Sequence, residues 1–163
     1  MKKAYFAGGC FWCIASVFDV VEGVSEVVSG FCGGDEANPS YEDVKARKTG
    51  HRETIMIVYD DSVIGYRKLV SILLANTDPF DPDGQFIDRG RSYSLAVYYS
   101  DEDEKLIAAD AVSVLEEASG KPVYVAIEPL KTFYAAEEYH QNYHKKHPEE
   151  FERELTESGR KKI

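Results

Sequence analysis

The chain has 163 residues, 44% hydrophobic and 29% charged, with a formal net charge of −10. This composition is typical of a globular protein, and the acidic balance disfavours nucleic acid as a partner, because binding to phosphates needs clustered Lys and Arg. No apolar run approaches the roughly 18 residues of a membrane span and the N-terminus lacks the apolar stretch of a signal peptide, so we expect one cytoplasmic domain over residues 1–163.

Hydrophobic periodicity predicts the secondary structure in chain order. The predicted elements are a strand at 4–7, a helix at 10–21, strands at 24–31 and 53–59, a helix at 66–76, a strand at 93–99, a helix at 101–119, a strand at 123–127 and a very polar helical tail at 135–156 interrupted at Pro148. Residues 37–48 read as a polar loop with a short helical turn. Residues 77–91 are rich in Asp, Pro and Gly and predict a long loop, which in a compact domain is usually functional.

The order of the first six elements matches a split βαβ–βαβ plan. It predicts an α+β fold, a ferredoxin-like α/β plait with a mixed, mostly antiparallel sheet, helices on one face and a polar helical C-terminal tail. A doubly wound parallel sheet is disfavoured, because no long helix separates the second strand from the third.

The most informative segment is the run Ala-Gly-Gly-Cys-Phe-Trp-Cys at 7–13. It places Cys10 at the start of a helix, where the partial positive charge favours thiolate over thiol. Cys13 follows three residues later and could close a disulfide with Cys10. The alternatives are a pair of buried apolar residues or a zinc site. Zinc needs a second ligand pair, and only Cys32 remains, so we expect no metal.

Several further segments form a recognisable set together with this run. They are Gly-Cys-Phe-Trp at 9–12, Val-Val-Ser-Gly-Phe-Cys-Gly-Gly at 27–34, Asn-Pro-Ser-Tyr at 38–41, Thr-Gly-His-Arg-Glu at 49–53, Gly-Gln-Phe-Ile-Asp-Arg-Gly-Arg-Ser-Tyr-Ser at 84–94, Glu-Pro at 128–129 and Ala-Glu-Glu-Tyr-His-Gln at 136–141. In this order they resemble the A-type peptide methionine sulfoxide reductases, and the resemblance covers nearly the whole chain. One departure is Ala15, where many family members carry Glu.

The resemblance implies a role for each of several residues. Cys10 would be the nucleophile that attacks the sulfoxide sulfur, and Glu53 the acid that protonates the leaving oxygen. Tyr41 and Tyr93 would donate hydrogen bonds to that oxygen, and Asp88 would organise the site through water. Without the resemblance, Glu53 would read as a solvated strand residue, the tyrosines as packing or surface residues, and Asp88 as a turn residue.

The resemblance also implies a binding pocket and a recycling route. Phe11 and Trp12 would hold the S-methyl group of the substrate, although Phe11 lies on the apolar stripe of the predicted helix and could be core. Cys13 is the first choice for the thiol that resolves the oxidised nucleophile, and Cys32 is the alternative; a relay through all three thiols is also possible. The implied substrate is the S epimer of methionine sulfoxide, free or in oxidised proteins. The implied reductant is thioredoxin, with no metal or nucleotide cofactor, and we expect a monomer.

Two other functions fit parts of the sequence. A general thiol–disulfide oxidoreductase would use the Cys-x-x-Cys motif and would not need Glu53, Tyr41 or Tyr93. A non-catalytic module could bind methionine-containing peptides through Phe11 and Trp12 without turnover.

Overall fold

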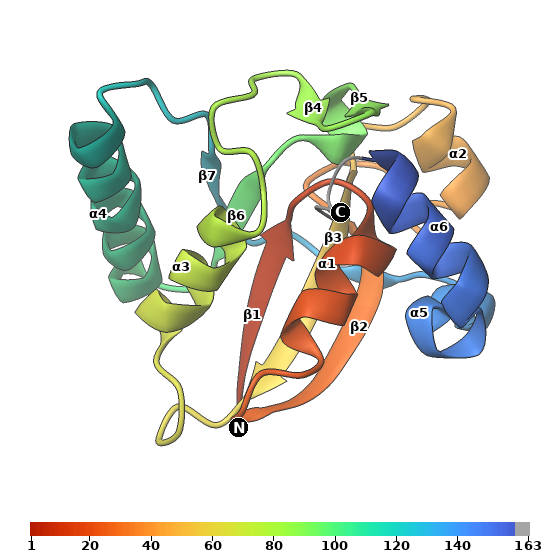
Figure 1. The fold of residues 1–163 in the computed structure, drawn as a ribbon, viewed down its shortest axis with the longest axis horizontal. Coiled ribbons are helices and arrows are strands. Elements are labelled where there is room, and N and C mark those ends of the chain that lie inside the picture. Colours follow the sequence, from red (N-terminus) through yellow and green to blue (C-terminus); the bar gives the residue numbers. More distant parts are fainter. Residues whose placement is uncertain (159–163) are drawn as a thin grey trace.

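A computed structural model describes residues 1–158 and has a mixed α+β architecture (Figure 1). The strands are β1 (Lys2–Ala7), β2 (Val24–Cys32), β3 (Arg52–Tyr59), β4 (Gly84–Gln85), β5 (Asp88–Arg89), β6 (Ala96–Tyr99), β7 (Ala126–Pro129) and β8 (Tyr134–Ala135). The helices are α1 (Phe11–Phe18), α2 (Tyr41–Lys45), α3 (Tyr66–Ala75), α4 (Glu102–Ser119), α5 (Tyr143–Lys146) and α6 (Pro148–Ser158), with 3₁₀ turns at Arg91–Tyr93 and Glu138–His140.

The main sheet has the strand order β7-β6-β1-β3-β2-β8. Its pairs are antiparallel except for β6 and β7, which are parallel. The unit β1-α1-β2-β3-α3-β6 supplies the four central strands, and its order is that of a ferredoxin-like plait. The predicted fold class is therefore confirmed, and β7 and β8 extend the sheet at its two edges.

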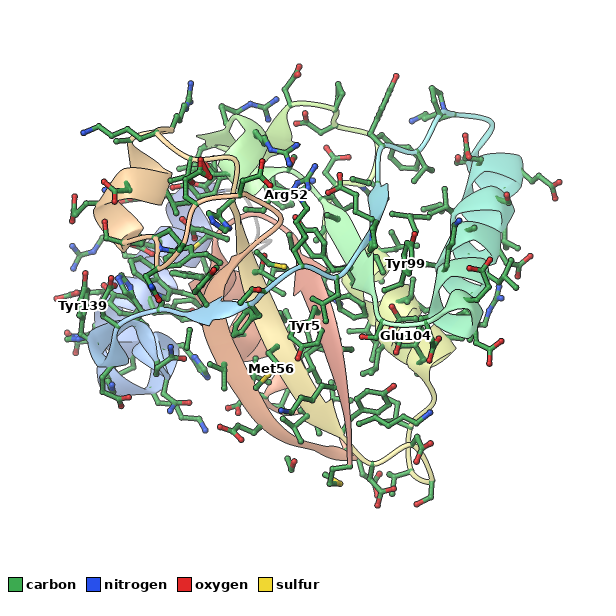
Figure 2. All side chains as sticks on the ribbon, turned by 180° about the vertical axis from the view of Figure 1, so that it is seen from behind. Tyr5, Arg52, Met56, Tyr99, Glu104 and Tyr139 are labelled. Atoms are coloured by element: carbon green, nitrogen blue, oxygen red, sulfur yellow. The ribbon has the colours of Figure 1, made fainter. Side chains whose placement is uncertain are left out.

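Alternation along the strands separates the two faces of the sheet. On the front face, Phe6 and Ile57 pack with α1 and α3 in the main core. On the back face, Tyr5 pairs across the strands with Met56, and Figure 2 shows both in this view from behind, with Arg52 farther along β3. The segment between β7 and β8 crosses this back face. Adjacent residues of one strand therefore point to opposite sides.

Several predicted boundaries are wrong, and the C-terminal segment differs most. The predicted helix at 10–21 ends at Phe18, and the predicted strand at 93–99 begins only at Ala96. The last predicted strand lies at Ala126–Pro129, and the short edge strand β8 was not predicted. The predicted tail at 135–156 is α-helical only in α5 and α6, and its predicted interruption lies between them, directly before Pro148. Pro148 begins α6, because proline fits the first helical turn, where its missing N–H has no partner to lose.

The C-terminal helices cover the helical face of the sheet beside α1. The short helix α5 packs against α1, and α6 continues past it toward α2 (Figure 1). Within residues 1–158, no helix combines the length and apolar character needed to cross a lipid bilayer.

Candidate active site

Cys10 lies at the start of α1, as the sequence predicts. It is the residue that caps the helix, and its carbonyl oxygen accepts the N–H groups of Cys13 and Ile14 at 3.1 and 3.2 Å. Gly9 adopts a φ of +90° between β1 and α1, a conformation that glycine reaches without steric cost. The tight turn leaves the Cys10 side chain partly exposed at the upper end of the sheet.

Cys13 lies one helical turn further on and is buried, with 3% of its surface exposed. Both cysteines are free thiols, and their side chains share a hydrogen bond. The two sulfurs are therefore close enough to form a disulfide, as residues three apart on a helix can.

Glu53 is buried on the front face of β3, with 2% of its surface exposed. Its Oε1 accepts the backbone N–H of Phe11 at 3.2 Å, which is the first N–H of α1. Burial raises the pKa of Glu53 to about 8, against the lowering effect of the Phe11 N–H, and the nearby charge of Asp88 raises it further. The carboxyl therefore carries a proton near neutral pH. A solvated Glu53, the alternative reading of the sequence, is excluded.

The titration of Cys10 differs from the sequence prediction of a thiolate. Its pKa is raised well above the ordinary value, mainly by the hydrogen bond with the Cys13 side chain, then by burial and by the nearby charges of Cys13 and Glu53. Glu53 occupies the first N–H of α1, and the backbone N–H of Cys13, which lowers the pKa of Cys10, does not outweigh these causes. Cys10 is therefore a thiol in the resting site, next to a protonated carboxyl.

Tyr41 and Tyr93 bring two hydroxyl groups to the same site. Burial raises the pKa of both, and the neighbouring charges of Glu53 and Cys10 raise it further. The Tyr93 hydroxyl also shares a hydrogen bond with Glu53. Both hydroxyls thus keep their protons and can donate to an oxygen atom. Asp88, at the start of β5, completes this side of the site.

Aromatic rings form the opposite wall. The Trp12 ring stacks on Tyr143 of α5 with ring centroids 4.0 Å apart, and it lies 6.0 Å from the Tyr41 ring. Phe11 is 1% exposed and packs behind this wall, against Phe31 in the core and against Trp12 and Tyr41. Trp12 thus faces the site, whereas Phe11 supports the rings that do.

These side chains enclose a cavity of about 340 Å³. It is lined by Cys10, Trp12, Cys13, Tyr41, Lys45, Glu53, Ile87, Asp88, Tyr93, Glu154 and Glu157. The structure therefore brings together all the predicted site residues except Phe11, which lies just behind the wall, and Cys32.

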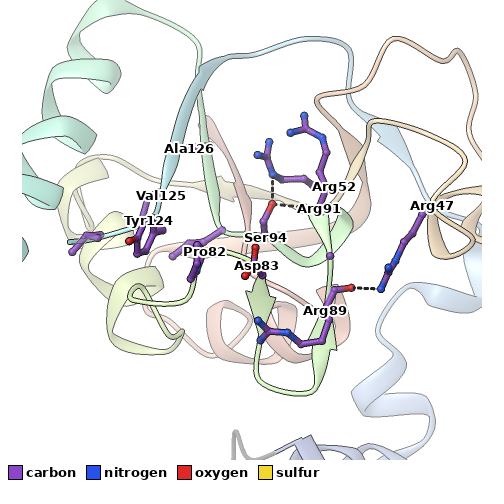
Figure 3. Close-up of a pocket in the computed structure, with 13 residues that line it drawn as sticks. Arg47, Arg52, Pro82, Asp83, Arg89, Arg91, Ser94, Tyr124, Val125 and Ala126 are labelled. Atoms are coloured by element: carbon purple, nitrogen blue, oxygen red, sulfur yellow. Dashed lines mark hydrogen bonds between the residues drawn. The ribbon is translucent and has the colours of Figure 1, made fainter. Parts of the chain in front are cut away.

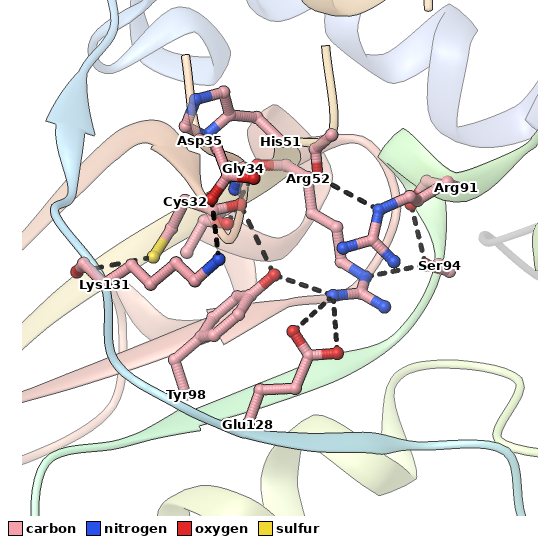
Figure 4. A network of polar contacts seen from close by, with 12 residues as sticks. Cys32, Gly34, Asp35, His51, Arg52, Arg91, Ser94, Tyr98, Glu128 and Lys131 are labelled. Atoms are coloured by element: carbon pink, nitrogen blue, oxygen red, sulfur yellow. Dashed lines mark hydrogen bonds and ion pairs between the residues drawn. The ribbon is translucent and has the colours of Figure 1, made fainter. Parts of the chain in front are cut away.

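Cys32 lies on the back face of the sheet. On β2, Phe31 points to the front core, and the next residue, Cys32, points the other way, opposite Arg52 of β3. The Cys32 thiol is fully buried and lies 3.8 Å from the carbonyl oxygen of Lys131, within a polar network that also contains Tyr98 (Figure 4). The sheet thus separates Cys32 from Cys10.

Sequence reasoning missed several contributors to the site. The cavity is also lined by Lys45 of α2, by Ile87 and by Glu154 and Glu157 of α6, and burial raises the pKa of Glu154. His140 is 1% exposed, its ring centroid lies 4.3 Å from that of Tyr41, and burial lowers its pKa. The apolar Phe151, which is buried on α6, was the signal that this charged tail packs against the body of the protein.

Among residues 1–158, no three His, Cys, Asp or Glu side chains gather as metal ligands. The site thus contains a thiol pair, a protonated carboxyl, two tyrosine hydroxyls and an aromatic wall. This set can carry out nucleophilic attack at an electrophilic atom whose leaving group needs a proton.

Comparisons with known proteins agree with this chemistry. The family model described as peptide methionine sulfoxide reductase matches residues 2–163. The peptide methionine sulfoxide reductase MsrA of Listeria monocytogenes is 45% identical, over 98% of this chain and 92% of that protein. The enzyme of the same name from Streptococcus equi is 46% identical, over 93% and 90%.

Solved structures show the same fold. Reduced Mxr1 from Saccharomyces cerevisiae has a TM-score of 0.86 at 27% identity, covering 91% of this chain and 86% of that chain. Methionine sulfoxide reductase A of Corynebacterium diphtheriae has a TM-score of 0.81 at 28% identity, covering 90% and 75%. The match over the whole sequence, the shared fold and the thiol–carboxyl site together show that the chain belongs to the peptide methionine sulfoxide reductase family.

Proposed function

We propose that this protein reduces the S epimer of methionine sulfoxide, free or in oxidised proteins, to methionine and so repairs oxidative damage. The observation that carries this proposal is the placement of the Cys10 thiol and the protonated Glu53 carboxyl in one cavity. A sulfoxide sulfur is attacked by a thiol only if its oxygen can leave as hydroxyl, and this site holds both the nucleophile and the acid.

In the first step, the sulfur of Cys10 bonds to the sulfoxide sulfur while Glu53 gives its proton to the oxygen. The thiol proton passes to the Glu53 carboxylate, which restores the acid. The hydroxyl then moves to the Cys10 sulfur, and both its bond to the substrate sulfur and the bond between the two sulfurs break. The products are methionine and a sulfenic acid on Cys10, so the substrate is reduced by two electrons and Cys10 is oxidised by two.

Tyr41 and Tyr93 support this step by donating hydrogen bonds to the sulfoxide oxygen as its negative charge grows. Their raised pKa values keep both hydroxyls in the donating form. Trp12 offers its face to the S-methyl group, since sulfur and methyl groups pack favourably on aromatic rings. We assign Asp88 to ordering water at the carboxyl side of the cavity.

Recycling follows from the position of the second thiol. Cys13 attacks the Cys10 sulfenic acid, forming a disulfide and releasing water, because it is the thiol in contact with Cys10. An external dithiol then reduces this disulfide. We infer that the dithiol is thioredoxin, because yeast Mxr1 has also been solved in complex with Trx2. The reduced structure of Mxr1 is 27% identical in sequence to this chain. We further propose that the protein is a cytoplasmic monomer.

A single-turnover assay tests the proposed function directly. The reduced protein is mixed with one equivalent of a peptide carrying one epimer of methionine sulfoxide, and methionine and remaining thiols are counted. We expect the S epimer to yield one methionine with loss of two thiols, and the R epimer to yield none. Disulfide reduction without sulfoxide reduction would identify a general thiol–disulfide oxidoreductase, and binding without turnover a peptide-binding module.

Serine variants of the two other cysteines test the recycling route. After one equivalent of sulfoxide, we expect Cys13→Ser to accumulate the sulfenic acid and to recycle poorly with thioredoxin. Cys32→Ser should form the disulfide between Cys10 and Cys13 at the wild-type rate, because Cys32 lies behind the sheet. Mass spectrometry of the peptides maps the bond. Wild-type recycling by Cys13→Ser would instead make Cys32 the resolving residue.

Alanine variants separate the two aromatic residues. Trp12→Ala is expected to raise KM for the sulfoxide up to about tenfold, the scale of a lost sulfur–aromatic contact, and to cost less stability than Phe11→Ala because Trp12 is only partly buried. Phe11→Ala removes a fully buried ring and should lower the free energy of unfolding by about 3–5 kcal/mol. Kinetics and urea unfolding of both variants check this; equal loss of stability in both would contradict the distinction.

A further inference from the structure

A second, larger cleft lies behind the wall of the active-site cavity. It has a volume of about 640 Å³ and gathers four arginines, at positions 47, 52, 89 and 91, in a protein of net charge −10 (Figure 3). Ser94 and the acidic Asp83 also line it. No step of the proposed reaction uses this cleft.

Two of the four guanidinium groups are neutralised by carboxylates. Arg52 forms an ion pair with Glu128 at 3.3 Å, and Arg89 forms one with Asp81. In the described part of the chain, Arg47 and Arg91 form no such pair. Their two positive charges exceed the single negative charge of Asp83, so the cleft has an excess of positive charge.

Backbone carbonyls hold these two unpaired side chains in place. Nη2 of Arg47 donates to the carbonyl oxygen of Arg89 at 2.9 Å, and Nε of Arg91 donates to that of Gly50 at 3.0 Å. Each tether uses one N–H and leaves others for a ligand. In Figures 3 and 4 the Arg91 side chain lies next to that of Arg52. Guanidinium groups fixed in this way bind carboxylates with little loss of side-chain entropy.

The backbone at Arg47 gives independent support. Arg47 follows the last turn of α2, where Lys48 N–H bonds back to the Asp43 carbonyl, and it has a φ of +60°. Glycine is the residue favoured at this helix end, and a larger residue there is strained. The Arg47 guanidinium also lies against Gly90, where an added Cβ would come within 3.1 Å of it. The chain thus keeps an arginine where its backbone favours glycine, and Gly90 makes room for it.

The cleft and the Cys10 cavity share one thin wall. Neighbouring residues of the chain line opposite sides of this wall. Glu53 and Asp88 line the cavity, whereas the adjacent Arg52 and Arg89 line the cleft. Tyr93 faces the cavity, whereas Arg91 faces the cleft. A peptide whose sulfoxide reaches Cys10 can therefore cross this wall and present a side chain a few residues away to the arginines.

We propose that this cleft binds the carboxylate of an acidic residue near the oxidised methionine in a protein substrate. The inference rests on the proposed function and specifies its substrate class: sulfoxides with Asp or Glu a few residues away. The shape and donors of the cleft also suit free phosphate, which the experiment distinguishes.

Two blocked peptides test the proposal, each with one methionine sulfoxide. One carries Glu two to five residues to either side, and the other carries Gln at the same positions. The protein has a net negative charge and repels the acidic peptide. Net charge alone therefore predicts a lower kcat/KM for the Glu peptide than for the Gln peptide. The cleft predicts the opposite, a kcat/KM about tenfold higher at low salt, the scale of one charge-assisted hydrogen bond.

The variants Arg91→Gln and Arg47→Gly should bring the ratio of the two kcat/KM values down to one or below. Arg47→Gly also removes the backbone strain, so we expect it to fold at least as stably as wild type. Arg67→Gln is the matched control: Arg67 is paired with Asp110 between α3 and α4, outside the cleft, and its loss should leave the ratio unchanged. An unchanged ratio in both cleft variants would overturn the proposal.

Inorganic phosphate tests whether the cleft binds a free anion rather than a carboxylate of the substrate. We expect phosphate to inhibit reduction of the acidic peptide competitively and to leave the Gln peptide unaffected. If phosphate shifts the NMR signals of the arginine N–H groups while wild type reduces both peptides equally, the cleft holds a free anion and the proposal is wrong. If neither peptide is reduced, the proposed reductase activity itself fails; equal reduction of both removes only this inference.

Discussion

Cys10→Ser is expected to abolish reduction of methionine sulfoxide and leave the fold intact. Serine occupies nearly the same volume at this partly exposed helix start, so packing should not change. Its hydroxyl, however, cannot give two electrons to a sulfoxide by forming a sulfenic acid. The measurement is methionine released in a single turnover, with circular dichroism and thermal unfolding as checks on the fold.

Cys32→Ser is the matched control for this variant. It also removes one thiol, but from the back face of the sheet, and should release one methionine per protein as wild type does. Substantial methionine release by well-folded Cys10→Ser would show that Cys10 is not the nucleophile.

Glu53→Gln is expected to slow the first chemical step about 10²–10⁴-fold while substrate binding is retained, because an amide cannot deliver the proton that the leaving oxygen needs. The same step in wild type should slow as pH rises through about 8, where Glu53 loses its proton, and this fall should be absent in Glu53→Gln. Rapid-mixing measurements of sulfenic acid formation across pH 6–10 check both statements.

Glu104→Gln provides the comparison for this second variant. Burial also raises the pKa of Glu104, but this residue lies on α4, outside the cavity, so its amide variant should keep the wild-type rate and pH profile. A rate for Glu53→Gln equal to that of wild type would assign the acid role to another group.

The sequence was sufficient to predict the plait, because the order and spacing of its first six elements leave few alternatives. It also identified the helix start at Cys10. The raised pKa of Cys10 could not be predicted, because it depends on the hydrogen bond with the Cys13 thiol, on burial and on the nearby charge of Glu53, 43 positions away. Burial and the approach of Glu53 arise from tertiary packing, which no local pattern encodes.

For Cys32 the alternation of side chains along the strand indicates its position. Phe31 and Cys32 are neighbours on one strand, so if Phe31 faces the core, Cys32 must face away from it. The C-terminal tail was hardest to place, because its many charges suggest a solvated helix. Its few apolar contacts, such as Tyr143 stacked on Trp12, decide where it lies.

The buried carboxyl of Glu53 also links folding to proton concentration. In the unfolded chain this carboxyl ionises at its ordinary pKa of about 4.5, whereas in the folded protein it holds its proton up to about pH 8. Between these values the native state binds more protons, so the stabilising contribution is complete below pH 4.5 and is lost as pH rises through 8. A mildly alkaline environment thus weakens the native state and removes the catalytic proton together. Glu53→Gln, which has no carboxyl to titrate, would remove this contribution of position 53 to the pH dependence of folding stability.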